Sequence, residues 1–171
     1  MKFSIRPARA QDCRDIERMI TELSVYEKMP GQVKISYKEL ERDGFGPNPF
    51  YQCLVAEVPQ EHISTEGHSV VGYVLYFYTY STWRGRCVYM EDLYVMPDFR
   101  GKGIGKALMA SVAKVCSEQQ CARLQLSVLD WNKPSLDFYF SKGAQDLTDT
   151  EGWHFLRFDG EALENLALEA P

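Results

Sequence analysis

Apolar residues recur at every third or fourth position in two stretches, which is the spacing of a helix with one buried face. The first stretch contains Ile16, Met19, Ile20 and Leu23, and the second contains Ile104, Leu108, Val112 and Val115. Asp12 precedes the first stretch and belongs to a residue type that caps helices. Shorter helices are predicted over residues 36–43, between Ser36 and Gly44, and over residues 133–141.

Runs of β-branched and aromatic residues predict strands at residues 3–6, 51–58, 70–80, 84–97, 123–129 and 152–158. The second and third runs flank a polar loop, so they should form a hairpin. Between the second helix and this hairpin, GFGPNPF cannot be regular, because it holds two prolines and two glycines in seven residues. The pattern predicts an α/β fold, with a mixed central sheet flanked by helices.

Composition narrows the functional classes only a little. The chain has 171 residues, of which 45% are hydrophobic and 25% charged, as expected for one globular domain over residues 1–171. Its net charge of -5 argues against a nucleic-acid partner, which calls for a basic surface. The same charge is compatible with a small cationic substrate.

Cysteine and histidine spacing gives no sign of a metal site. The five cysteines form no CxxC pair, so we expect neither a zinc site nor a disulfide framework, and we expect a reducing compartment. The three histidines also lack ligand spacing. The first residues have no apolar leader pattern, and SVVGYVLYFYTYSTW is too short to span a bilayer. We therefore expect a cytoplasmic protein without metal or membrane contact.

A glycine-rich stretch, DFRGKGIG, lies between a predicted strand and a predicted helix. It fits neither the GxGxxG dinucleotide pattern nor the P-loop pattern. It does fit R-x-x-G-x-G from Arg100 to Gly105, which resembles the acetyl-CoA pyrophosphate motif of GCN5-related N-acetyltransferases (GNATs). Amides at a helix start, with no side chains in the way, suit a pyrophosphate. The alternative is an ordinary glycine turn before a helix.

Two adjacent acids, Glu91 and Asp92, interrupt an otherwise apolar strand. Neighbouring strand residues point to opposite faces, so one acid should face a site unless a bulge turns the second. A carboxylate could bind an ammonium group and relay its proton through water. The alternative is that one acid is exposed and the other pairs with an arginine.

A third motif, WNKPSLDFY, places Asn132 and Ser135 at a helix start and Tyr139 near the helix end. A tyrosine, whose pKa is about 10, can protonate a leaving thiolate, whose conjugate thiol has a pKa of about 8.5. From the residues alone, a core aromatic beside Phe138 and Phe140 is the favoured interpretation of Tyr139.

Together, EDLYVMPDFRGKGIG, VLDWNKPSLDFY and GAQDLTDTEGWHF resemble the diamine acetyltransferase family of the GNAT superfamily. That family includes spermidine/spermine N-acetyltransferases and thialysine N-epsilon-acetyltransferases. VYEKMPGQVKIS and DGFGPNPFYQCLVAEVP extend the resemblance over nearly the whole chain. It implies a GNAT fold with a mostly antiparallel sheet, acetyl-CoA as cosubstrate, a small cationic amine as acceptor, and a homodimer whose substrate sites draw on both subunits.

The resemblance also implies roles for individual residues. Tyr139 would be the proton donor, and Glu91 would bind the amine and accept its proton through water. The cofactor would contact Leu93, Tyr94, Val95, Arg100, Gly101, Lys102, Gly103, Ile104, Gly105, Lys106, Asn132, Lys133, Pro134, Ser135 and Tyr139. The substrate would contact Tyr26, Glu27, Glu91, Asp92, Gln125, Leu126, Ser127 and Glu151.

The residues leave the substrate and the mechanism open. Ser81-Thr82-Trp83 and residues 129–132 look more like the thialysine branch than the spermidine/spermine branch. Direct attack of the amine on the thioester is expected, and a cysteine-mediated ping-pong route is the alternative. A protein or peptide acetyltransferase and a catalytically silent acyl-CoA-binding protein are the other functional alternatives.

Overall fold

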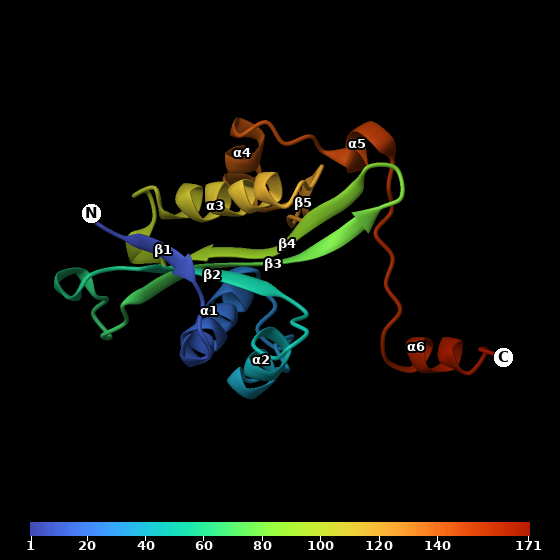
Figure 1. Ribbon diagram of the computed structural model, residues 1–171, viewed down its shortest axis with the longest axis horizontal. Coiled ribbons are helices and arrows are strands. Elements are labelled where there is room, and N and C mark those ends of the chain that lie inside the picture. Colours follow the sequence, from blue (N-terminus) through green and yellow to red (C-terminus); the bar gives the residue numbers. More distant parts are fainter. The chain divides into compact units, whose positions relative to one another are not determined.

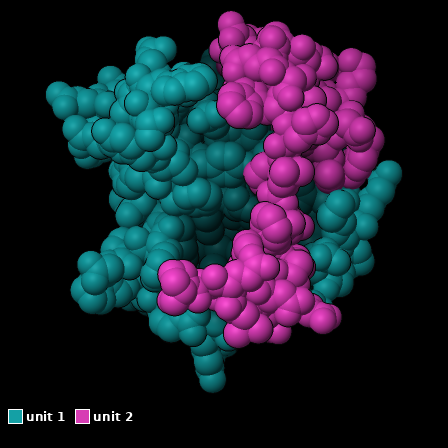
Figure 2. Space-filling model, turned by 90° about the vertical axis from the view of Figure 1, so that its right-hand side faces the viewer, with its two compact units in different colours: residues 1–127 teal, residues 128–171 magenta.

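The computed structural model describes residues 1–171, which divide into two compact units, residues 1–127 and 128–171 (Figure 2). The first unit holds a five-stranded sheet in the order β1-β2-β3-β4-β5 (Figure 1). Its strands are β1 (Ser4–Pro7), β2 (Gln52–Glu57), β3 (Val70–Ser81), β4 (Gly85–Val95) and β5 (Leu124–Leu126). β1 to β4 pair antiparallel, and β5 pairs parallel to β4. The predicted α/β class, mostly antiparallel sheet and β2–β3 hairpin are confirmed.

Helices of the first unit cover both faces of this sheet (Figure 1). α1 (Cys13–Tyr26) and α2 (Tyr37–Gly44) lie on one face, and α3 (Ile104–Glu118) lies on the other. Ser36 caps α2 as predicted, since its side chain accepts from the Lys38 amide and Glu39 completes a capping box. Asp12 stands before α1, but its carboxylate instead accepts from the Arg9 amide and from Arg6.

One part of the core lies between α3 and the middle of β2, β3 and β4, and another part lies under α1, where Ile16 and Met19 are fully buried. Ile104, Leu108 and Val112 are at most 1% exposed, as the helical spacing predicts. The fourth residue of the buried stripe is Cys116 rather than Val115, because the stripe continues in steps of four. Gly72 allows the close packing here: a Cβ atom on it would lie 3.0 Å from the Tyr94 carbonyl oxygen.

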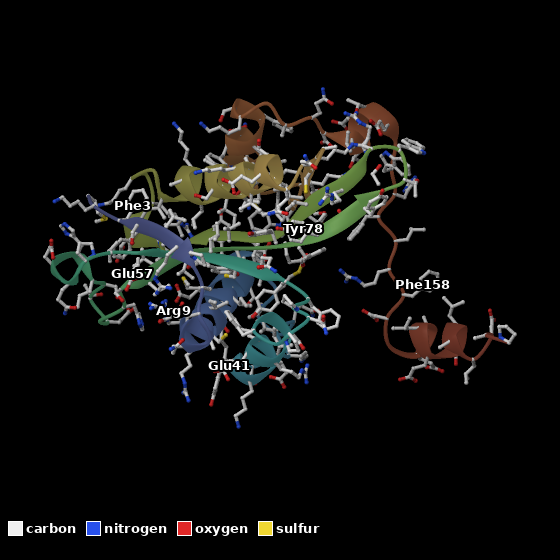
Figure 3. The ribbon with its side chains drawn as sticks, in the orientation of Figure 1. Phe3, Arg9, Glu41, Glu57, Tyr78 and Phe158 are labelled. Atoms are coloured by element: carbon white, nitrogen blue, oxygen red, sulfur yellow. The ribbon has the colours of Figure 1, made fainter.

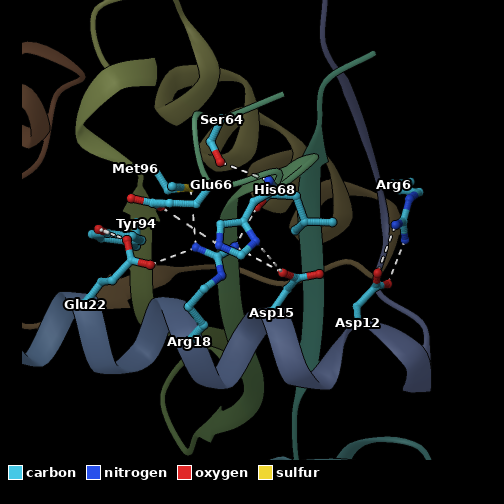
Figure 4. A network of polar contacts seen from close by, with 11 residues as sticks. Arg6, Asp12, Asp15, Arg18, Glu22, Ser64, Glu66, His68, Tyr94 and Met96 are labelled. Carbon is cyan, nitrogen blue, oxygen red and sulfur yellow. Dashed lines mark hydrogen bonds and ion pairs between the residues drawn. The ribbon is translucent and has the colours of Figure 1, made fainter. Parts of the chain in front are cut away.

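Arg18 of α1 ties this helix to the sheet (Figure 4). Its guanidinium donates to the Val70 carbonyl oxygen at 2.9 Å, where β3 begins, and to Glu22 at 2.7 Å. The hydroxyl of Tyr94 in β4 donates to the other oxygen of Glu22 at 2.9 Å. These bonds fix one face of α1 against the start of β3 and the end of β4.

Short 3-10 turns lie at Ala10–Asp12, Gln60–His62 and Pro97–Phe99.

The second unit contains α4 (Lys133–Ser141), α5 (Leu147–Glu151) and α6 (Gly160–Ala167). The prediction of a strand over residues 152–158 is wrong, because this segment has no regular secondary structure. Its large apolar side chains are exposed instead, as Figure 3 shows for Phe158. The strand predicted over residues 123–129 is confirmed only in part, since β5 has three residues.

No helix has both the length and the apolar character needed to cross a membrane.

Candidate functional site

A β-bulge interrupts β4 at the two adjacent acids. Asp92 pairs with Leu75 and Met90 pairs with Tyr76, so the register of the two strands skips Glu91. An extra residue of this kind breaks the alternation of side chains between the faces. Glu91 is exposed, whereas Asp92 is only partly so. A bulge, which the sequence left as a possibility, is therefore present. The alternative of one exposed acid and one arginine-paired acid holds in its first half only, because Glu91 is exposed but Asp92 bonds a tyrosine.

Asp92 receives its hydrogen bond from the hydroxyl of Tyr73, at 2.7 Å to Oδ2. Burial raises the pKa of the Asp92 carboxyl above its ordinary value, and the bond from Tyr73 opposes that rise. Glu27, at the end of α1, has a pKa raised first by burial and then by the charges of Asp92 and Glu91. Such repulsion among carboxylates is relieved when a cation binds between them, so this cluster is suited to an ammonium group.

The guanidinium of Arg100 lies near two aromatic rings. Its guanidinium carbon lies 5.3 Å from the ring centroid of Tyr26 and 5.5 Å from that of Tyr94. Its Nε donates to the Val95 carbonyl oxygen at 2.8 Å. Cation–π contacts at this distance and the hydrogen bond hold the base of the side chain. The structure thus brings together predicted substrate residue Tyr26 and predicted cofactor residues Tyr94, Val95 and Arg100.

The glycine segment forms the start of α3. Gly101 and Gly103 have φ angles of 75° and 88°, a conformation that other residues rarely adopt, and neither has an atom within 4 Å of a built Cβ. Gly105 is helical, and its Cβ would lie 3.7 Å from Val95. The first amides of α3 lack helical partners, so an anion can bind them. Ile104 is buried, and the neighbouring Lys102 and Lys106 are exposed.

The predicted substrate residues Gln125, Leu126 and Ser127 lie in β5 or directly after it. β5 pairs with the edge of β4 that faces away from β3. Gln125 pairs with Tyr89 and Leu126 with Met90, just before the bulge. The Ser127 hydroxyl lies 2.6 Å from the Tyr89 hydroxyl. These residues therefore border the same part of β4 as the two acids.

Other predicted site residues belong to the second unit. Asn132 caps α4, where its Oδ1 accepts from the Ser135 amide at 3.4 Å, and Pro134 lies in the first turn. Tyr139 is 9% exposed and meets the Phe138 ring edge-on, with ring centroids 5.4 Å apart. Lys133 and Glu151 make contacts with residues close in sequence. Lys133 pairs with Asp137, and Glu151 accepts a hydrogen bond from the Trp153 indole at 2.7 Å.

Sequence reasoning missed three residues that support this site: Tyr73, Glu22 and Arg18. Tyr73 stands in an aromatic run whose spacing does not distinguish it from its neighbours. The register of the β3–β4 pair could have identified it, because Tyr73 lies opposite Tyr94, two residues from Asp92 on the same face. Glu22 and Arg18 are spaced as an ordinary surface ion pair on α1.

Comparison with known proteins finds a matching family and similar sequences. Residues 16–143 match the model of the Acetyltransferase (GNAT) family. The thialysine N-epsilon-acetyltransferase of Bos taurus is 53% identical over 163 residues, which cover 95% of this chain and 96% of that one. The spermidine/spermine N(1)-acetyltransferase-like protein 1 of Homo sapiens is 40% identical, over 98% of this chain and 24% of that one.

Solved structures share the fold. An integron cassette protein from V. cholerae superposes with a TM-score of 0.74 at 25% identity, over 98% of both chains. A ribosomal-protein-alanine N-acetyltransferase from Brucella melitensis superposes with a TM-score of 0.70 at 19% identity, over 92% of this chain and all of that one.

The raised pKa of Asp92 predicts that this carboxylate lowers stability. A carboxyl with a raised pKa in the folded state destabilises the protein increasingly as the pH rises above the unfolded-state pKa of about 3.9, and the effect is complete above the folded-state pKa. Asp92→Asn should therefore raise the melting temperature at pH 7.5, and the gain should vanish near pH 4. Calorimetry at both pH values measures this. A variant less stable than the parent at pH 7.5 would contradict it.

Proposed function

The chain belongs to the Acetyltransferase (GNAT) family, and from this premise we propose that it transfers acetyl from acetyl-CoA to a primary amine of a small cationic substrate. That the chain is an N-acetyltransferase follows from its relatives. The observation that carries the choice of acceptor is the acidic cluster of Glu27, Glu91 and Asp92, with Tyr73 bonded to Asp92.

The glycine segment is proposed to hold the cofactor. GNAT acetyltransferases use acetyl-CoA, and the residues present fit its pyrophosphate: free amides start α3, and Gly101 and Gly103 leave open space where side chains would stand. Exposed Lys102 and Lys106 add positive charge. Leu93 and Val95 would offer backbone groups to the pantetheine arm, and Asn132 to Ser135 would complete the site. Acetyl-CoA supplies an activated thioester.

Side chains of the site would carry out the proton transfers that the reaction needs. An ammonium with a pKa of about 10.4 is neutral in only about one molecule in 2,500 at pH 7, and only the neutral amine attacks a thioester. Glu91 would take that proton through water, with Asp92 and Glu27 holding the substrate's charge. The amine nitrogen bonds to the carbonyl carbon, the carbon–sulfur bond breaks, and Tyr139 would protonate the departing thiolate.

Direct attack is favoured over a cysteine-linked acetyl intermediate. That route needs a thiol with a lowered pKa beside a base. Burial instead raises the pKa of Cys13 to about 11, and it raises the pKa of Cys53 and Cys116 as well. These three thiols are therefore poor nucleophiles at neutral pH.

The preferred amine is proposed to be thialysine or a close lysine analogue, since the chain is 53% identical to a thialysine N-epsilon-acetyltransferase. CoA release should be measured in parallel with thialysine, lysine, spermidine and spermine. Thialysine should give the highest kcat/KM. A peptide amine that exceeds all four would favour a protein acetyltransferase, and no turnover with any amine would favour a silent acyl-CoA-binding protein.

Gly103→Ala should weaken CoA binding more than folding. The φ angle of 88° strains any other residue, and the new methyl group would stand where the pyrophosphate approaches. Gly67→Ala is a matched control, because Gly67 has the same φ of 88° and an equally open Cβ direction. Both variants should lose similar stability, on the order of 1 kcal/mol. Calorimetric titration should show at least tenfold weaker CoA binding for Gly103→Ala alone; equal affinities in the two variants would refute the assignment.

Tyr139→Phe should lower kcat by about 10²-fold while leaving acetyl-CoA affinity unchanged, since only the hydroxyl is lost. A tyrosine that merely packs beside Phe138 predicts near-normal turnover, so a kcat within twofold of the parent would end the proton-donor role. Glu91→Gln is the companion variant. Loss of the base should alter the acidic limb of the pH–rate profile, whereas loss of the acid should alter the basic limb.

A homodimer is proposed because large apolar side chains of the second unit are exposed. The side chains of Trp153, Phe155, Leu156 and Phe158 are 59% to 81% exposed. A second copy that covers these side chains would bury apolar surface that otherwise favours aggregation. Sedimentation should give a dimer at micromolar concentration, and Phe155→Ser with Leu156→Ser should shift it toward monomer. A fully active monomeric parent would contradict this.

A cytoplasmic location is proposed from the five free cysteines, which suit a reducing compartment. Fractionation of cells that express a tagged chain would test it, and recovery from an oxidising compartment would contradict it.

A further inference from the structure

The hydroxyl of Tyr73 is a neutral donor that the structure places on the Asp92 carboxylate of the acidic cluster. Tyr73 is fully buried in β3, and its hydroxyl donates to Asp92 Oδ2 at 2.7 Å. A charge-assisted hydrogen bond of this kind is stronger than a bond between neutral groups. Because it uses Oδ2, it leaves Oδ1 for a donor from outside the protein.

We propose that Tyr73 is a positioning residue of the amine site, which holds the Asp92 carboxylate in place so that Oδ1 can accept from the cationic substrate. The inference rests on the proposed amine acetyltransferase function and adds to it a residue on a strand that carries none of the predicted site residues. Tyr73 itself does not touch the substrate in this account. It acts through Asp92.

The ring of Tyr73 is held so that its hydroxyl has little freedom. Its centroid lies 6.3 Å from that of Tyr94, at an interplanar angle of 47°. Tyr94 is in turn fixed by its bond to Glu22, which pairs with Arg18. A donor locked by packing loses little entropy when it bonds the carboxylate, so it orients Asp92 better than a mobile surface group or a water molecule would.

The groups that face Asp92 otherwise favour its neutral form. Glu27 approaches from the end of α1, Glu91 is its neighbour on β4, and the Cys53 thiol lies on β2. Burial raises the pKa of Asp92 and so favours its protonated form, and a protonated acid cannot pair with an ammonium group. Tyr73 opposes this, and burial raises its own pKa well above the ordinary value, so it remains a donor.

Tyr76 supplies a matched control on the same strand. It is 4% exposed and, like Tyr73, has a pKa raised by burial, in its case to about 12. It pairs with Met90 on the other side of the bulge and contacts the Tyr78 ring edge-on rather than a carboxylate. Tyr76→Phe therefore removes a buried hydroxyl without touching the Asp92 bond.

The test compares the parent, Tyr73→Phe and Tyr76→Phe. For each, kcat and KM for the best of the four amines are measured from pH 5.5 to 9.5, together with acetyl-CoA affinity and melting temperature. Tyr73→Phe should raise the amine KM about tenfold at pH 7, as expected for losing a hydrogen bond to a charged group. Its kcat should stay within threefold and its acetyl-CoA affinity should be unchanged.

The pH profile separates positioning from simple stabilisation. Without Tyr73's bond, the pKa of Asp92 rises further, so the acidic limb of kcat/KM should move to higher pH in Tyr73→Phe and stay in place in Tyr76→Phe. In an Asp92→Asn background, Tyr73→Phe should change KM by less than twofold, because the effect passes through that carboxylate.

The outcomes are distinct. A Tyr73→Phe profile that matches Tyr76→Phe, or a tenfold further loss in the Asp92→Asn background, overturns the role of Tyr73 and leaves the proposed function standing. A parent that acetylates none of the four amines overturns the proposed function, and this inference with it.

Discussion

The bulge at Glu91 is the constraint on which the arrangement of the site depends. On its amino-terminal side, β4 pairs with both β3 and β5. Beyond it, Asp92 and Tyr94 share the face that α1 covers, where Tyr94 reaches Glu22. A regular strand would place Glu91 and Asp92 on opposite faces with no change of register. The bulge instead leaves Glu91 exposed, and Asp92 within reach of Tyr73.

From the bulge onward the chain carries consecutive parts of the proposed site. The acids come first, then the backbone of Leu93 to Val95, then the turn at Pro97–Phe99, and finally the glycines that start α3. Arg100 bonds back to the Val95 carbonyl oxygen and stacks against Tyr26 and Tyr94. A single strand–turn–helix unit therefore links groups suited to an amine with groups suited to a phosphate. The raised pKa values of Asp92 and Glu27 predict that these carboxylates lower stability, as is common where a site must bind charge.

The sequence was informative where a pattern is local. Helical spacing identified α1 and α3, a capping residue marked α2, and the polar loop marked the β2–β3 hairpin. It failed for residues 152–158, whose apolar alternation is typical of a strand, because a strand also needs a hydrogen-bonding partner, which a local pattern does not supply. It also left α5 and α6 unassigned.

The same limit applies to the site. The glycine motif and the paired acids could be identified from residue types and spacing, and the possibility of a bulge could be stated. The bond from Tyr73 to Asp92 could not, because it joins residues 19 apart in sequence and depends on the register between their two strands. The register in turn follows from packing over the whole sheet.

The central claim is that the segment from β4 into α3 binds CoA through its backbone. Hydrogen–deuterium exchange with and without CoA tests it most directly. The account predicts slower exchange for the amides of residues 103–106 when CoA is present, and no change in the loop of residues 64–68. Unchanged exchange at residues 103–106 at a saturating CoA concentration would contradict it.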